Sequence, residues 1–274
     1  MTSMNGRTVL VTGATDGIGR QTAQDLAVMG ASVIIHGRDQ KRLQEARAEI
    51  TKTTGNQEIE TIAADFASLR QVKTMADEII ARFPNLHVLV NNAGFISLEH
   101  MTTEDGYEMN FQINHLASFL LTNLLLGLLK KSAPARIVTV ASDAHAMCDL
   151  DFDNLQAEKN FTWLNSYGLA KLGSVYMTYE LAERLQGCGV VANCLHPGNV
   201  DTKMQRATST DQGVSTAIGA ATQVYLASAP EAAAINGRFF IDLQDTPTCD
   251  LAYDVESRRK FWKVSEELVK DYFA

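Results

Sequence analysis

The sequence predicts a single α/β domain over residues 5–274, with a doubly wound parallel sheet of about seven strands and helices on both of its faces. Short β-branched runs alternate with longer helical stretches, an order typical of strand–helix–strand units in a parallel sheet. Runs such as Val9-Leu10-Val11 are apolar without alternation, as expected of strands that are covered on both faces. No repeat or linker divides the 274 residues into two domains.

Each expected strand is a short apolar or β-branched run. The strands cover residues 8–12, 32–36, 58–63, 87–91, 136–141, 190–196 and 238–241. Helices are expected between them, because parallel strands need long crossover connections. They cover residues 18–29, 40–52, 69–82, 106–131, 167–186, 213–227 and, near the end of the chain, 255–271.

Composition excludes several classes of partner. The net charge is −8, whereas nucleic acids and anionic membranes both require a basic surface, so neither is expected as the main partner. The four cysteines are scattered and no histidine stands at metal-ligand spacing, so we expect free thiols and no metal site. The first residues resemble neither a signal peptide nor an anchor, and the most apolar run, 119–129, is shorter than a membrane span. We therefore expect a cytoplasmic protein without a membrane anchor.

The expected helix over 106–131 has an unusual distribution of apolar residues. Between residues 114 and 131 they occur on nearly every side, whereas a helix that covers a sheet normally has one apolar stripe. The excess indicates a second surface that packs on this helix. Another subunit of a homo-oligomer would supply it, and the alternative is cover by the chain's own segment 142–166.

A glycine-rich turn follows the first expected strand and leads into the first helix. Glycines at this spacing permit a tight turn and close backbone approach to a pyrophosphate, which would face the free N–H groups of the helix. A purely structural turn is the alternative, but the position between a strand and a helix favours a dinucleotide site. The residues expected to bind the cofactor here are Gly13, Thr15, Asp16, Gly17, Ile18 and Gly19.

The spacing Thr12-Gly13-x-x-x-Gly17-x-Gly19 differs from the common G-x-G-x-x-G fingerprint and resembles the signature of the short-chain dehydrogenase/reductase family, whose fold is of the Rossmann type. Further motifs in the same order strengthen the resemblance. It implies that the adenine, ribose and nicotinamide regions of the cofactor meet three later segments, which contain Asp65 and Phe66, then Asn92, Ala93 and Gly94, then Pro197, Gly198, Val200 and Thr202.

The end of the second strand predicts the cofactor. An NAD enzyme needs a carboxylate here to bind the ribose 2′-hydroxyl, but Gly37 stands in its place and Arg38 follows. A guanidinium can bind a 2′-phosphate through two charge-assisted hydrogen bonds, so we expect NADP(H). Asp39 should point into the cap of the next helix. Asp16 lies where many NADP enzymes of the family have a basic residue, and an NAD(H)-preferring enzyme remains the alternative.

Tyr167 and Lys171 are four residues apart, so they project from one face of a helix. A phenol can act as general acid or base if a nearby ammonium lowers its pKa, and both residues are also expected to lie beside the cofactor. Ser142, at the end of the fifth strand, would hydrogen-bond the substrate oxygen. The family resemblance implies that Asn114 is the fourth catalytic residue and holds a water that links Lys171 to solvent.

Local sequences such as Asn114-His115-Leu116 and His196-Pro197-Gly198 resemble the retinol-dehydrogenase-like branch of this family, which implies hydride transfer to or from a small or lipophilic carbonyl or alcohol. The substrate should meet residues 95–101, 142–166 and 199–212, the last of which is polar and predicts a mobile lid. His145 could contact the substrate or simply be solvated. The alternative from another class is a nucleotide-binding regulator without catalysis.

Overall fold

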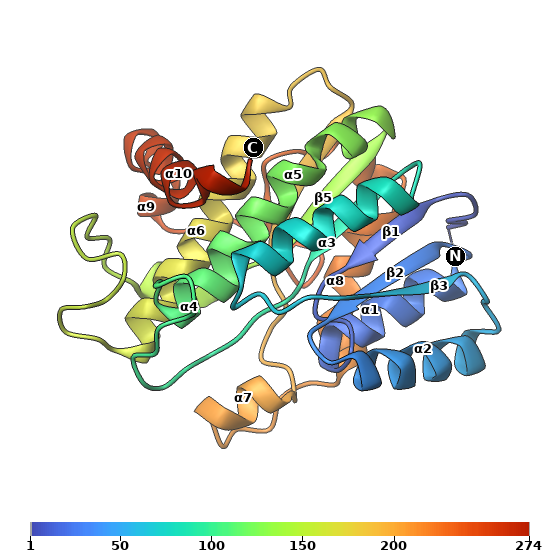
Figure 1. The fold of residues 1–274 in the computed structure, drawn as a ribbon, viewed down its shortest axis with the longest axis horizontal. Helices are drawn as coiled ribbons and strands as arrows, with labels where there is room; N and C mark the ends of the chain where they lie inside the picture. The colour runs from blue at the N-terminus through green and yellow to red at the C-terminus, as the bar shows by residue number, and fades with distance from the viewer. Residues whose placement is uncertain (1, 274) are drawn as a thin grey trace.

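The computed structural model describes residues 2–273 and contains one eight-stranded sheet in the order β3-β2-β1-β4-β5-β6-β7-β8 (Figure 1). The seven predicted strands are present and parallel, and β8 pairs antiparallel with β7. The sequence did not predict β8, because it has two exposed residues and no apolar pattern. The strands are β1 (Thr8–Val11), β2 (Ser32–Gly37), β3 (Ile59–Ala63), β4 (Val88–Asn91), β5 (Ala135–Val140), β6 (Val190–His196), β7 (Phe239–Ile241) and β8 (Gln244–Asp245).

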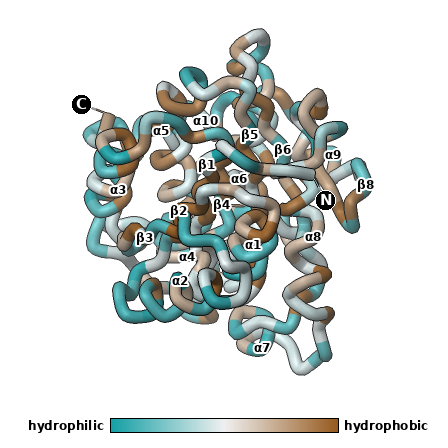
Figure 2. Tube along the Cα trace, turned by 90° about the vertical axis from the view of Figure 1, so that its right-hand side faces the viewer, coloured by the Kyte–Doolittle hydropathy of each residue, from teal (hydrophilic) through white to brown (hydrophobic). Residues whose placement is uncertain are grey.

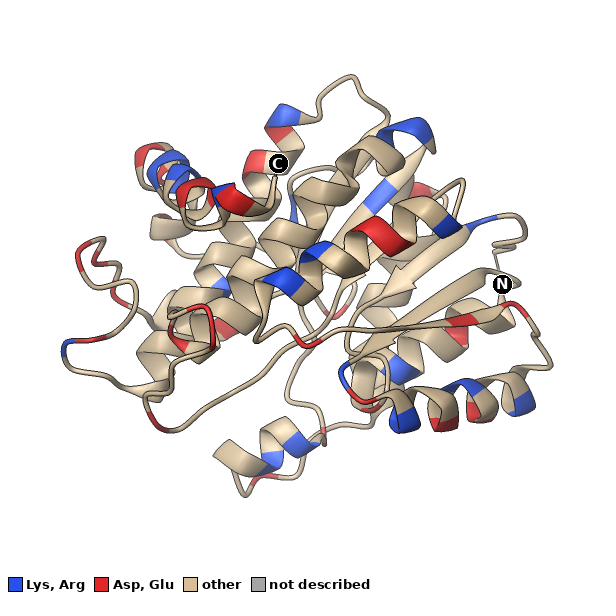
Figure 3. Cartoon of the chain, in the orientation of Figure 1, with Lys and Arg blue, Asp and Glu red and all other residues tan. Residues whose placement is uncertain are grey.

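Helices cover both faces of the sheet, as predicted. One core lies under α1, α2 and α8, and a larger one lies under α3, α5, α6 and α10. Strands in the middle of the molecule are mostly apolar in Figure 2, whereas α2 is largely hydrophilic. Charged residues are frequent on the outer helices, as the blue and red segments of α2, α3 and α10 show in Figure 3. The helices are α1 (Gly17–Val28), α2 (Gln40–Thr54), α3 (Leu69–Arg82), α4 (Met109–Phe111), α5 (Ala117–Lys131), α6 (Trp163–Arg184), α7 (Lys203–Thr208), α8 (Thr216–Ser228), α9 (Asp250–Tyr253) and α10 (Val255–Val269).

Three expected elements differ from the structure. The helix predicted over 106–131 begins at Met109 and is interrupted by a π turn over Gln112–Leu116. The helix predicted from residue 167 begins at Trp163, where Thr162 caps it by accepting a hydrogen bond from the Asn165 N–H. Segment 199–212, predicted as a mobile lid, contains the short helix α7, which lies at the lower edge of Figure 1.

The apolar surface of α5 is covered mainly by α3, and the chain's own C-terminal helix α10 adds a contact at the first turn of α5. The Phe119 ring lies 4.7 Å from the ring of Trp262 on α10, and α3 packs along another side of α5. The segment 142–166 is therefore not the principal cover, and the apolar excess no longer requires a second subunit. By length and composition Met109–Lys131 is also the one helix among the described residues that could cross a membrane, but most of it is buried inside the protein.

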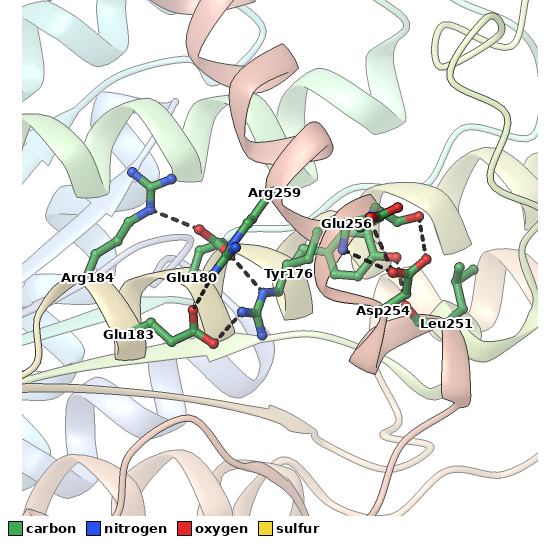
Figure 4. A network of polar contacts seen from close by, with 10 residues as sticks. Tyr176, Glu180, Glu183, Arg184, Leu251, Asp254, Glu256 and Arg259 are labelled. Carbon is green, nitrogen blue, oxygen red and sulfur yellow. Dashed lines mark hydrogen bonds and ion pairs between the residues drawn. The ribbon is translucent and has the colours of Figure 1, made fainter.

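Buried charges fix α10 against α6 (Figure 4). Arg258 of α10 forms an ion pair of 2.8 Å with Glu180 of α6, and both side chains are almost fully buried. Glu180 also accepts a hydrogen bond from Arg184, whose guanidinium lies 4.2 Å from the centre of the Trp262 ring. A buried ion pair adds little net stability, because the cost of desolvating both charges offsets most of their attraction. Loss of one partner, however, leaves the other charge buried and uncompensated. The pair therefore makes the docking of α10 specific.

Replacing Arg258 with alanine should lower the free energy of unfolding by about 3 kcal/mol, because Glu180 would stay buried without its main partner. Arg259→Ala is the matched control, since Arg259 is exposed and lies 3.8 Å from Glu183, and it should change stability by less than about 1 kcal/mol. Urea unfolding of the two variants measures the difference. Equal, small losses would show that the buried pair does not hold α10.

Candidate active site

The residues predicted for the site gather at the carboxyl ends of β1 and β4. The order of the strands in the sheet reverses between these two strands. These strands are neighbours in the sheet although about 80 residues separate them in sequence. The chain leaves β1 toward α1 and leaves β4 in the other direction, so the two loops diverge. A doubly wound sheet binds its ligands in this crevice.

The glycine-rich loop packs directly on the segment after β4. A β-carbon on Gly13 would lie 2.8 Å from the Cα of Ala93, and one on Gly19 would lie 2.3 Å from Nδ2 of Asn92. The Asn92 side chain donates a hydrogen bond to the carbonyl of Thr12 (2.7 Å), and Thr12 Oγ1 accepts from the Asn92 and Ala93 N–H groups, both at 2.9 Å. Only glycine fits these two positions without displacing the backbone or Asn92. The loop is thus held against β4 directly before the N-terminus of α1.

His36 of β2 is a part of this cradle that the sequence analysis left without a role. Its Nδ1 accepts a hydrogen bond from the Gly13 N–H (3.2 Å), so Nε2 carries the proton and donates to the Ala64 carbonyl (3.0 Å). Burial lowers the pKa of His36 to about 4, and the ring is therefore neutral at pH 7. Phe66 stacks on this ring at 4.5 Å. A neutral imidazole joins the ends of β1, β2 and β3, and its position at a strand end was the only signal in the sequence.

Beside the cradle lies the region predicted to select the cofactor. Gly37 leaves room for Thr15, whose methyl group lies 2.5 Å from where a β-carbon of residue 37 would be. Arg38 is exposed and has no ion pair with any residue from 2 to 273. Asp39 caps α2 by accepting a hydrogen bond from the Arg42 N–H, which confirms the expected cap. A guanidinium is therefore free at the end of β2.

Asp16 does not leave an unpaired negative charge in the loop. It caps α1 through the Gly17 N–H and forms ion pairs with Arg42 (3.1 Å) and Lys203 of α7 (2.7 Å). Hydrogen bonding by Lys203 is the largest influence that lowers the pKa of Asp16. Neither Arg42 nor Lys203 was predicted from the sequence as a partner of Asp16. These pairs neutralise the acidic residue that seemed unfavourable for NADP(H).

The segment after β6 approaches the same loop from the other side. The Thr202 methyl group lies 3.5 Å from where a β-carbon on Gly17 would be. Val200 and Ile18 both lie against Gly219 of α8 and would clash with a side chain there. Pro197 and Gly198 form the turn between β6 and this segment, with Gly198 at φ 80°. Asp65 closes the opposite end of the site, where it accepts a hydrogen bond from the Ala67 N–H (3.0 Å).

Asn114 and Lys171 meet at Gly94. A β-carbon on Gly94 would lie 3.2 Å from Asn114 Oδ1 and 3.7 Å from Lys171 Nζ. The π turn holds Asn114, whose side-chain amide donates to the carbonyls of Asn110 and Phe95, each at 2.8 Å. The buried Lys171 donates to the Val140 carbonyl at 2.9 Å. Two of the predicted catalytic residues therefore lie side by side below the β4 loop.

Ser142 and Tyr167 form the other half of the predicted group. Lys171 Nζ lies 5.5 Å from the centre of the Tyr167 ring, and the Ser142 hydroxyl lies close enough to the phenol to influence its pKa. Gly168 permits this arrangement, since a β-carbon there would lie 2.6 Å from the Ala144 carbonyl oxygen. All four predicted catalytic residues are thus brought together, and each is buried.

Lys171 was expected to lower the pKa of Tyr167. In the protein by itself the pKa of Tyr167 is raised instead. Burial raises the pKa of Tyr167 to about 12 and lowers the pKa of Lys171 to about 8. Desolvation penalises both charged forms in this enclosed position, and it is the largest influence on the pKa of each group. At pH 7 Tyr167 is therefore a phenol, which suits the donation of a proton.

Two further features of the site were not predicted. His145 is buried, where Nδ1 contacts the Ser142 carbonyl and Nε2 contacts Thr248, so it is neither solvated nor open to a substrate. Met204 of α7 reaches into the site, where its methyl carbon lies 3.3 Å from where a β-carbon on Gly94 would be. Neither contact has a local sequence signal, because the partners are distant in the chain.

Comparison with known proteins agrees with this geometry. The family described as short chain dehydrogenase matches residues 7–213. Retinol dehydrogenase 14 of Homo sapiens is 40% identical over 97% of this chain and 87% of its own length. Retinol dehydrogenase 13 of Homo sapiens is 40% identical over 96% of this chain and 85% of its own length.

Solved structures share the fold. A protein from Mycobacterium paratuberculosis has a TM-score of 0.83 and 30% identity, with 98% of this chain and 96% of that chain covered. A short chain dehydrogenase from Escherichia coli CFT073, complexed with NADPH, has a TM-score of 0.72 and 26% identity over 88% of this chain and 98% of that chain. The parallel sheet, the glycine-rich loop against β4 and these relatives together lead to one conclusion: the chain belongs to the short chain dehydrogenase family, in its retinol-dehydrogenase-like branch.

Proposed function

We propose that this protein transfers hydride between NADP(H) and a small or lipophilic aldehyde or ketone, or the corresponding alcohol. Membership of an oxidoreductase family supports the reaction class. The observation that carries the proposal is the cluster of Ser142, Tyr167, Lys171 and Asn114 beside the glycine-rich cradle. A regulator without catalysis would have no need to bury these four groups together.

The cradle fits a dinucleotide. Gly13 and Gly19 tolerate no side chain, so the backbone of this loop can approach a pyrophosphate closely before the N-terminus of α1. Arg38, exposed and without an ion pair within the described residues, would bind a 2′-phosphate. A solved relative in complex with NADPH supports the same choice. When bound, NADP(H) would supply or accept the hydride, and its oxidised form would add a positive charge at the site.

The protein's own residues would manage the proton. In reduction, the Tyr167 hydroxyl would donate a proton to the substrate oxygen, and the Ser142 hydroxyl would stabilise the charge that develops on this oxygen. The raised pKa of Tyr167 keeps the phenol protonated for this purpose. Lys171 lies within reach to attract the phenolate, and Asn114 holds the β4 loop in place through its hydrogen bonds to Phe95.

A lipophilic substrate is supported by the surface of the predicted substrate segments. Leu98 and Met101 on one segment, and Met147 and Leu164 on the other, are large exposed apolar side chains. The two segments touch through His100, which is hydrogen-bonded to the Gln156 carbonyl at 3.0 Å. A panel of neutral aldehydes, with retinal included because of the names of the relatives, would identify the preferred compound.

The proposed location of the protein remains the cytoplasm.

Tyr167→Phe should lower the rate of NADPH-dependent aldehyde reduction by at least about 10³-fold, because the variant lacks the acid that completes the reaction. Binding of NADPH, measured by fluorescence titration, should change little. Tyr225→Phe, on α8 beside Phe240, is the control and should keep full activity. Undiminished turnover by the Tyr167 variant would remove it from the mechanism.

Arg38→Asp should lower the ratio of kcat/KM for NADPH over NADH by about 100-fold, because a phosphate-binding cation becomes a repelling anion. Steady-state rates with both cofactors measure this ratio. Arg47→Asp places the same charge change further along α2 and should leave the ratio nearly constant. If Arg38→Asp also leaves it constant, the enzyme does not recognise the 2′-phosphate through Arg38, and the NAD(H) alternative is favoured.

A further inference from the structure

A carboxylate lies directly against the proposed catalytic serine. The Ser142 hydroxyl donates a hydrogen bond to Asp143 Oδ1 at 3.0 Å, and Ser142 Oγ accepts one from the Ala144 N–H at 3.2 Å. The Ala144 N–H belongs to the backbone of the 3-10 turn over Asp143–Met147, which Ser142 caps. The orientation of the serine therefore does not depend on Asp143, whereas the direction of its single proton does.

In the proposed reaction, the hydroxyl proton of Ser142 must form a hydrogen bond to the substrate oxygen. A hydroxyl has one donor, so Ser142 cannot donate to Asp143 and to a substrate carbonyl at the same time. A carboxylate accepts more strongly than a neutral carbonyl, because the hydrogen bond is charge-assisted. Binding of the substrate must therefore break an existing hydrogen bond of Ser142.

The charge of Asp143 is not cancelled by its neighbours. His196, at the end of β6, lies 3.6 Å from Asp143 Oδ1, but its Nδ1 accepts a hydrogen bond from the Asp143 N–H and burial lowers its pKa. His145 also has a lowered pKa from burial, and Asp242 adds a second negative charge near His196. Lys171 is a cation near this group, and its charge also lowers the pKa of His196.

We propose that Asp143 is a positioning residue that restrains this site, because its carboxylate competes with the substrate oxygen for the Ser142 proton. The inference rests on the proposed function above. In agreement with it, the charge of Asp143 contributes to the raised pKa of Tyr167. The enzyme should therefore act as a general acid over a wide pH range and begin alcohol oxidation only at high pH.

Two variants separate charge from hydrogen bonding. Asp143→Asn keeps an acceptor oxygen beside Ser142 and removes the charge, whereas Asp143→Ala removes both. In both variants the rising limb of the pH profile for alcohol oxidation should move to lower pH by about half a unit, because loss of a nearby anion favours the phenolate. Asp143→Ala alone should also lower KM for a neutral aldehyde about fivefold, because Ser142 no longer loses a hydrogen bond when the aldehyde binds.

The control is Asp250→Asn, which removes one exposed carboxylate at the start of α9 and should leave the pH profile and KM unchanged. A second readout needs no turnover: in NMR titrations, Asp143→Asn should lower the pKa of His196, because a carboxylate 3.6 Å away is lost. The inference would be overturned if the pH limb of Asp143→Asn does not shift, if KM rises in Asp143→Ala, or if the titration of His196 does not change. In each case, normal turnover by the wild type would leave the proposed function intact. If the wild type turns over no carbonyl compound, the proposed function itself fails and the inference falls with it.

Discussion

The site depends on how closely the chain after β1 approaches the chain after β4. Gly13 and Gly19 bring two backbones within van der Waals contact, and Thr12 and Asn92 lock them together through hydrogen bonds. Close contact here has two consequences. It fixes the cradle in front of α1, and it also sets the position of Gly94, around which Asn114 and Lys171 gather. The glycine-rich cradle and the group proposed to transfer the proton thus lie on two sides of one tightly packed loop.

Burial decides the electrostatics of this group more than the charges within it do. Tyr167 and Lys171 are both enclosed, and desolvation moves each pKa toward the neutral form. His36 behaves in the same way and serves as a neutral hydrogen-bonding bridge between strand ends. The charged groups of the site are instead partly exposed to solvent. Asp16 pairs there with Arg42 and Lys203, and Asp143 lies beside His196.

The helices behind the site are held by equally specific contacts. The helix α6 carries Tyr167 and Lys171 on its first turns, and further along it holds Glu180, which binds Arg258 of α10. Because Trp262 of α10 also contacts Phe119 of α5, the C-terminal helix links α6 to the helix that follows the π turn of Asn114. The π turn before α5 completes the arrangement, since it turns Asn114 toward the β4 loop.

The sequence by itself determined the seven parallel strands, the cap at Asp39 and the set of residues that gather at the sheet edge. These features depend on local signals: apolar runs, glycine spacing and residues one helical turn apart. The tertiary structure alone decided that α3 and α10 pack on α5, that a π turn interrupts the helix over Met109–Lys131, that His145 is buried and that Asp143 accepts the hydrogen bond of Ser142. It also reversed the expected shift in the pKa of Tyr167. Each of these depends on which distant segments exclude water from a side chain, and burial of that kind has no signature in the neighbouring residues.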